Sequence, residues 1–117
     1  MICGGMGGVM EAAARGAREE GGITVGILPG DDPESGNRHL AVRVATGFGH
    51  GRNVLIPRSC HGVIAVAGGY GTLSEIALTL KMGVPLVGVE TWDPDGSFPV
   101  VSGGEEAVDL LFRRLEP

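Results

Sequence analysis

The sequence is poor in several features that mark whole classes of protein. It has two cysteines, Cys3 and Cys60, which are too few for a disulfide framework, so we expect small buried residues at both positions. No apolar run approaches the roughly 20 residues that a membrane-spanning helix needs. The first residues, MICGGMGG, lack the basic start and apolar stretch of a signal peptide, and we expect a cytoplasmic protein.

Cations are also scarce. The net charge is −5, and the only lysine is Lys81. A nucleic-acid surface needs clustered cations, so the composition argues against that class of partner. The 117 residues are enough for one domain, and we predict a single domain over residues 1–117.

Glycine is the residue in excess, with 22 copies that follow no collagen-like period. Several of them fall between alternating apolar segments. We expect strands at 1–3, 23–28, 43–46, 62–67 and 85–90, helices at 9–20, 72–82 and from about 104, and a helix from about 47 that ends near Pro57. Residues 29–41 are predicted to form a long loop.

Apolar strands that alternate with helices are typical of an α/β fold of the Rossmann-like kind, with a parallel sheet covered by helices on both faces in three layers. Right-handed crossovers place every strand-to-helix turn at the carboxyl edge of such a sheet, where ligands bind. Two of these turns, Gly4–Gly8 and Gly68–Thr72, are rich in glycine. We therefore expect both turns to lie on one edge and to face one ligand.

Both turns fit phosphate binding, because a helix N-terminus presents unpaired N–H groups and glycine lets the backbone approach an anion. The alternative is that glycine only permits a sharp turn or close packing. Neither turn is a Walker loop, and neither matches G-x-G-x-x-G well.

Thr72 and Glu75 have two interpretations. T-x-x-E before an apolar run is a capping box, in which the threonine caps the helix and the glutamate bonds back to it. Alternatively, Glu75 lies in the first helical turn and acts on a bound sugar as a base or a cation stabiliser. His39, His50 and His61 show no metal-binding spacing, so we expect no metal and no resident cofactor.

The motif GGYGTLSE resembles the PGGxGTxxE signature of the LONELY GUY family, a superfamily often labelled lysine decarboxylase-like. GGMGGVMEAAARGA resembles that family's first glycine loop and helix, and GHGRNVLIPRSCHGVIAV lies where the family has an arginine-lysine pair. The resemblance covers residues 1 to about 92. It is greatest to a bacterial branch that also resembles molybdenum-cofactor carrier proteins.

The resemblance implies that Arg52 and Glu75 are the catalytic residues. It also implies that the glycine turns hold the ligand and its phosphate. The implied ligand-binding residues are Gly4, Gly5, Gly7, Gly8, Gly68, Gly69, Gly71 and Thr72.

The sequence departs from the family pattern in three ways. Ala67 replaces the signature proline, which we interpret as a minor change, and Asn53 replaces the lysine of the arginine-lysine pair. The family's first strand and helix are lacking, so we expect that the protein starts upstream or that the chain is a fragment. A sheet running without interruption from 23–28 through 1–3 to 62–67 would refute this expectation.

Two functions follow as hypotheses. The first is hydrolysis of the N-glycosidic bond of nucleoside 5′-monophosphates, a phosphoribohydrolase reaction. The second is binding without chemistry, as a carrier of molybdenum cofactor or a related phosphorylated ligand, and a structural domain without a ligand is the third alternative. Lysine decarboxylation is excluded, because pyridoxal chemistry needs a lysine Schiff base and Lys81 lies at the far end of its helix.

The helix over 72–82 is apolar nearly all round, which predicts a homodimer or higher homo-oligomer.

Overall fold

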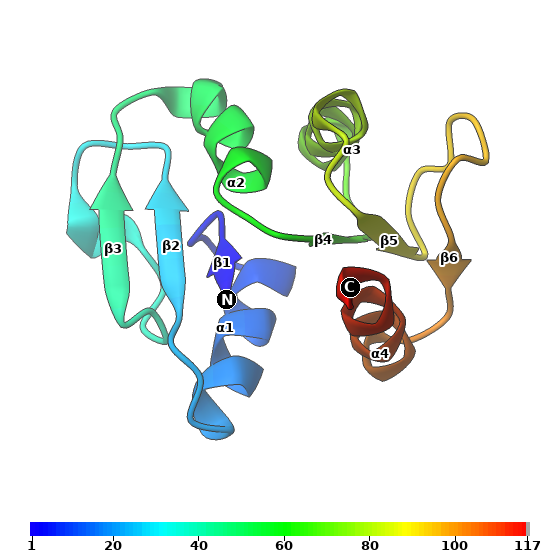
Figure 1. Ribbon diagram of the computed structural model, residues 1–117. Helices are drawn as coiled ribbons and strands as arrows, with labels where there is room; N and C mark the ends of the chain where they lie inside the picture. The colour runs from blue at the N-terminus through cyan, green and yellow to red at the C-terminus, as the bar shows by residue number, and fades with distance from the viewer. Residues whose placement is uncertain (117) are drawn as a thin grey trace. The chain divides into compact units, whose positions relative to one another are not determined.

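The computed structural model describes residues 1–116, and the chain divides into two units, Met1–Ile56 and the residues from Pro57 onward. Each unit contains its own sheet of three parallel strands (Figure 1). Helices and parallel strands alternate along both, which confirms the predicted α/β, Rossmann-like class. The described strands thus form two sheets, one in each unit.

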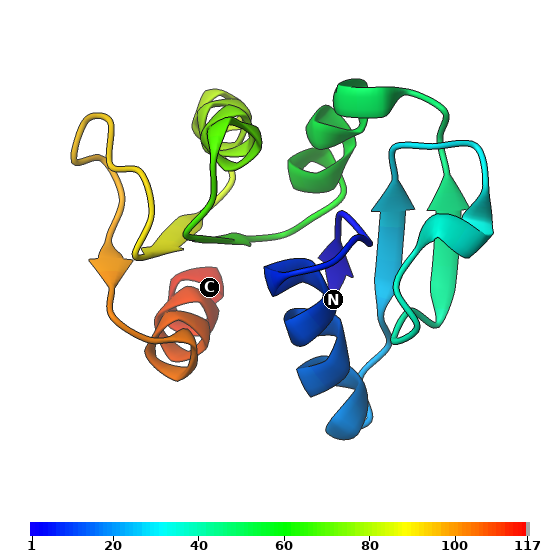
Figure 2. The ribbon, with the colours of Figure 1, turned by 180° about the vertical axis from the view of Figure 1, so that it is seen from behind.

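The first unit has the strand order β1-β2-β3, with β1 at Ile2–Cys3, β2 at Val25–Leu28 and β3 at Val42–Ala45. Helix α1 (Val9–Glu19) connects β1 to β2 and lies beside them in both views (Figures 1 and 2). Its Ala14 packs with Leu28 and Leu40 in a small core, to which Cys3 and Met6 add partly buried side chains. This cluster holds the first glycine turn against β2.

Two short 3₁₀ helices lie in the connections of the first unit. The first, η1 (Pro33–Ser35), interrupts the predicted loop 29–41, and Asp32 caps it by accepting a hydrogen bond from the Glu34 N–H. The second, η2 (Gly49–Val54), leads into helix α2 (Leu55–Arg58). The helix predicted from about Gly47 is therefore a 3₁₀ segment followed by one α-helical turn, and Pro57 lies near its end as expected.

The second unit has the order β4-β5-β6, with β4 at Val63–Val66, β5 at Leu86–Val89 and β6 at Val100–Val101. Helix α3 (Tyr70–Met82) covers one face of this sheet and α4 (Gly104–Leu115) covers the other (Figure 1). Alternate residues of β5 serve the two faces, since Leu86 packs with Ile76 of α3 while Val87 packs with Leu111 of α4. This unit is therefore a helix–sheet–helix sandwich.

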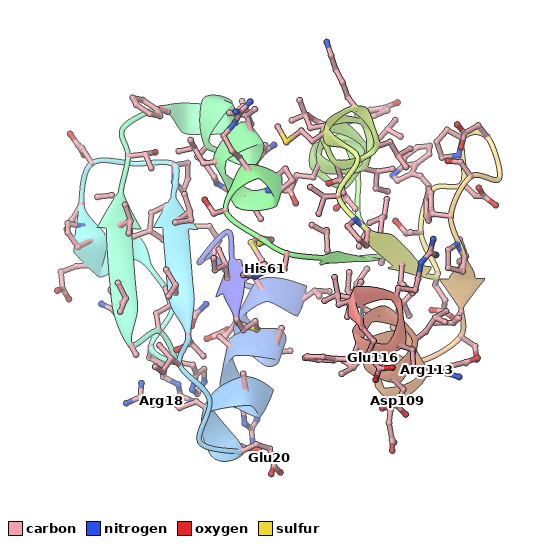
Figure 3. All side chains as sticks on the ribbon, in the orientation of Figure 1. Arg18, Glu20, His61, Asp109, Arg113 and Glu116 are labelled. Carbon is pink, nitrogen blue, oxygen red and sulfur yellow. The ribbon has the colours of Figure 1, made fainter. Side chains whose placement is uncertain are left out.

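Both helices of the second unit end or begin in ways that the sequence explains. Gly83 ends α3 with φ 72°, a left-handed conformation that glycine adopts without strain. Helix α4 has Glu105 and Glu106 in its first turn and Arg113 in its last, which suits the helix dipole. Asp109 and Arg113 are exposed and point away from the sheet (Figure 3).

Candidate functional site

The first glycine turn contains two kinds of glycine. Gly4 and Gly5 are buried, and a Cβ at Gly4 would lie 2.5 Å from Arg52 Nη1 and 2.7 Å from Met10 Sδ. A Cβ at Gly5, where φ is 77°, would overlap the Leu28 side chain. Packing therefore requires glycine at both positions, as the structural interpretation of the turn expects.

Gly7 and Gly8 are exposed, and a Cβ at either would meet no atom within 4 Å. Gly8 is the N-cap residue of α1 with φ 66°, and no side chain caps the helix there. The first four N–H groups of a helix have no acceptor within that helix. The beginning of α1 thus offers backbone N–H groups beside two exposed glycines.

Arg52 lies directly over this turn. Its Nη1 approaches Gly4 and donates a hydrogen bond of 3.0 Å to Oδ1 of Asn53, a side chain that is 7% exposed. Arg52 and Asn53 also line a cavity of about 210 Å³ together with Pro29, Gly49 and His50. The structure therefore brings together the predicted arginine and the first glycine turn.

Asn37 is a residue of this site that the sequence analysis missed. Its Nδ2 donates to the Met6 carbonyl at 2.9 Å, and its backbone N–H donates to the Gly5 carbonyl at 2.8 Å. Its own Oδ1 accepts from the His39 N–H at 3.0 Å. Asn37 thus fixes the carbonyl groups of the glycine turn across a separation of more than 30 residues, which no local spacing indicates.

The second glycine turn joins β4 to α3. Ala67 and Gly68 both have positive φ, 44° and 94°, and the Thr72 side chain lies so close to Gly68 that a Cβ there would overlap it. Gly69 and Gly71 are exposed, and a Cβ at either would meet no atom within 4 Å. Gly68 is therefore required by the turn, whereas Gly69 and Gly71 leave the surface over the helix N-terminus open.

Side chains that follow β5 hold the carbonyl groups of the second turn. Thr91 Oγ1 donates to the Ala67 carbonyl at 2.7 Å, and Trp92 Nε1 donates to the Gly69 carbonyl at 3.1 Å. The Ala67 N–H donates to the Val89 carbonyl at 3.0 Å. The sequence analysis did not assign Thr91 or Trp92, although both follow a predicted strand at its carboxyl end.

The predicted capping box at Thr72 and Glu75 is wrong. Helix α3 begins at Tyr70 with Gly69 as its N-cap, and no side chain forms a cap hydrogen bond there. Thr72 is already the third helical residue, so Glu75 lies in the second turn rather than the first. Glu75 is half-buried, and its carbonyl accepts a hydrogen bond of 2.6 Å from Thr79 Oγ1.

Partial burial raises the pKa of the Cys60 thiol, which makes this cysteine a poor nucleophile. Cys3 and Cys60 are half-buried rather than buried as expected. Across residues 1–116 no three His, Cys, Asp or Glu side chains gather as a metal-binding group. No helix in the same range is long and apolar enough to cross a membrane.

Both glycine turns follow the carboxyl end of a parallel strand, β1 in the first unit and β4 in the second. A model of the SLOG cluster4 family matches residues 1–108. The chain belongs to the SLOG cluster4 family.

Solved structures agree with this assignment. The molybdenum cofactor binding protein from the phototrophic bacterium Rippkaea orientalis matches with a TM-score of 0.90 and 31% identity, over 98% of this chain and 77% of that one. The molybdenum cofactor carrier protein from Chlamydomonas reinhardtii matches with a TM-score of 0.81 and 29% identity, over 97% and 76%. The predicted resemblance to the superfamily and to the cofactor carriers is confirmed.

A curated relative from Archaeoglobus fulgidus, an uncharacterized protein, is 52% identical over 83 residues. The match covers 71% of this SLOG cluster4 chain and 54% of the relative. The chain therefore spans about half the length of the curated relative it matches.

Proposed function

We propose that this SLOG cluster4 protein binds a small phosphorylated ligand of the molybdenum-cofactor type, a phosphorylated pterin, and carries it without chemistry. The observation that carries the proposal is the likeness, at a TM-score of 0.90 and 31% identity, to a protein named for binding molybdenum cofactor. The acidic composition and the absence of lysine clusters leave backbone N–H groups and arginine to hold an anion.

In this proposal the first turn of α3 holds the phosphate. Gly69 and Gly71 are exposed there, so an anion has close access to the N–H groups of the helix N-terminus. Gly68 and Thr72 shape the turn. In the first unit, Gly7 and Gly8 leave the beginning of α1 open beside Arg52, and we propose that this turn binds an anionic group as well, with Gly4 and Gly5 as its packed base.

The test introduces a negative charge at Gly69 in the second glycine turn and compares it with a neutral side chain of almost the same volume. Gly69 has φ −94°, and a Cβ there meets nothing within 4 Å, so a side chain is tolerated. We expect Gly69→Asp to weaken binding of molybdopterin, and of AMP as a simpler phosphorylated probe, at least tenfold, because a carboxylate repels the phosphate at close range. Isothermal titration calorimetry measures both affinities.

The neutral variant Gly69→Asn is the matched control, because it adds almost the same volume without charge. It should keep most of the affinity. Equal affinities of the Asp and Asn variants would contradict a phosphate at this turn, and no binding of either probe by the unchanged protein would contradict the proposed function.

Phosphoribohydrolase activity is the second candidate, and the half-buried Glu75 on the second turn of α3 favours it. A carboxylate there would stabilise a developing ribosyl cation, or activate water. Incubation with AMP and chromatographic detection of free adenine test it, with Glu75→Gln as the variant that should abolish release. Adenine release that persists in Glu75→Gln would remove that residue from the mechanism.

A homodimer or higher homo-oligomer in the cytoplasm belongs to the same proposal. Leu73, Leu78 and Met82 of α3 are only half-buried within their unit, which supports a further partner for this helix. Light scattering after size-exclusion chromatography gives the mass that decides it.

A further inference from the structure

The only tyrosine and the only tryptophan of the chain lie against each other beside the second glycine turn. Tyr70 is the first residue of α3, and Trp92 follows β5. Their rings are stacked, with centroids 6.0 Å apart and planes inclined by 22°. Both side chains are open to solvent, Tyr70 at 83% exposure and Trp92 at 40%.

The tryptophan ring has a fixed place. Its Nε1 donates to the Gly69 carbonyl at 3.1 Å, and the neighbouring Thr91 donates to the Ala67 carbonyl at 2.7 Å. The indole therefore cannot rotate away without losing a hydrogen bond to the turn. It supports one side of the tyrosine ring, and the high exposure of Tyr70 leaves the other side open.

Core packing does not account for the tyrosine of this pair. The core between α3 and the sheet consists of Ala65, Ile76, Leu86 and Phe98, and Tyr70 takes no part in it. An exposed aromatic ring in a fixed orientation is what proteins present to the planar rings of nucleotides and related ligands. The pair therefore has the form of a binding surface.

The ring spacing determines where a ligand fits. A planar ring between Tyr70 and Trp92 would need about 3.5 Å on each side, about 7 Å in all, and the centroids are 6.0 Å apart. A ligand ring consequently stacks on the outer side of Tyr70, while Trp92 stays behind it.

We propose that Tyr70 and Trp92 form a stacking platform for the planar, fused nitrogen heterocycle of the ligand, a ring of the pterin or purine class. This inference rests on the proposed function, since the same ligand's phosphate lies at the adjacent turn. Trp92 and Thr91 are positioning residues that keep both the platform and the turn in place.

The experiment separates ring from phosphate with three probes. AMP carries both, ribose 5-phosphate carries the phosphate without a ring, and pterin carries a ring without phosphate. Calorimetry gives each affinity, and the emission of Trp92, the only tryptophan, reports indirectly on the environment of the pair through Tyr70. AMP and pterin should change this emission, and ribose 5-phosphate should not.

The variant Tyr70→Ala should weaken AMP and pterin binding about tenfold and leave ribose 5-phosphate within about twofold, whereas Tyr70→Phe keeps the affinities. The matched control is Phe112→Ala, which removes an aromatic side chain of 65% exposure from α4 in the same unit and should change none of them. Circular dichroism checks that each variant is folded.

The outcomes distinguish this inference from the proposed function. AMP affinity that is equal in the unchanged protein and in Tyr70→Ala overturns the platform and leaves the phosphate proposal standing. Pterin binding that depends on Tyr70, without binding of either phosphorylated probe, supports the platform and overturns the phosphate proposal. If none of the three probes binds, both are overturned.

Discussion

At the scale of single residues, Ala67 has a backbone conformation that is unusual for a residue other than glycine. Its φ of 44° is a left-handed conformation that costs an alanine about 1 kcal/mol or more. The Ala67 N–H bonds to Val89 and its carbonyl accepts from Thr91, so both ends of the residue are held. Ala67 stands where the family has a proline, and we interpreted this replacement as minor. A proline ring fixes φ near −65°, so a proline could not adopt the conformation of Ala67, and the replacement is not minor for this turn.

We expect Ala67→Pro, which restores the family signature, to destabilise this protein. Proline would force the turn out of its φ of 44° and remove the hydrogen bond of 3.0 Å to Val89. The expected loss is about 2–4 kcal/mol in the free energy of unfolding, measured by urea denaturation. Ala67→Gly is the control, since glycine tolerates positive φ and keeps the N–H, and its effect should stay within about 1 kcal/mol. If Ala67→Pro leaves the free energy of unfolding unchanged, the turn has a second stable conformation that accepts proline.

Residue spacing predicted some site positions and missed others for a physical reason. The two glycine turns follow from local composition, because glycine marks positive φ and close approach within a few residues. Asn37, Thr91 and Trp92 act through hydrogen bonds that span 23 to 31 positions along the chain. Such partners depend on the register of whole strands, which the sequence of a turn does not contain.

At the scale of elements, Thr24 ties the start of β2 to the end of the loop 29–41. The side chain is fully buried, and its Oγ1 donates to the His39 carbonyl at 2.7 Å and accepts from the Ala41 N–H at 2.9 Å. Because this loop also carries Asn37, the anchor at Thr24 bears on the first glycine turn. The loop is long, but hydrogen bonds attach it to Thr24 before β2 and to the first glycine turn.

Thr24→Val should destabilise the protein by about 2 kcal/mol, because the shape is kept while the His39 carbonyl loses its partner and the Ala41 N–H keeps only its bond to the Thr24 carbonyl. Thermal and urea unfolding measure the change. Thr24→Ser retains the hydroxyl and serves as the control, with an expected loss of about 1 kcal/mol for the missing methyl group. If the serine variant loses more than the valine variant, packing rather than hydrogen bonding dominates at this position.

Most helices and strands were predictable, because the spacing of apolar residues and the positions of turn residues indicate the same boundaries over most of the chain. The helix predicted at 72–82 starts two residues earlier, because Gly69 ends the turn and Tyr70 already has helical geometry. Strand β6 was missed, since two valines in a stretch of turn residues give no period, and only pairing with β5 defines them as a strand. Tertiary contacts decided both cases.

At the scale of the whole molecule, the two units are each small. The core cluster of the first contains Ala14, Leu28 and Leu40, and the clusters of the second contain four buried residues each. A domain of about 60 residues buries only about 60% of the surface that its unfolded chain exposes, and is marginally stable alone. The family model matches residues 1–108 as one stretch that includes parts of both units, and the single domain stays a prediction.

We therefore expect one cooperative unfolding transition. Trp92 emission reports on the second unit alone, whereas far-ultraviolet circular dichroism reports on the helices of both. The two signals should give the same midpoint, which is the test of two-state behaviour. Moreover, Thr24→Val, a change within the first unit, should lower the midpoint of the Trp92 signal by as much as that of the dichroism. A Trp92 midpoint that ignores this substitution would show that the units unfold separately, and each would then have to be treated as a domain of its own.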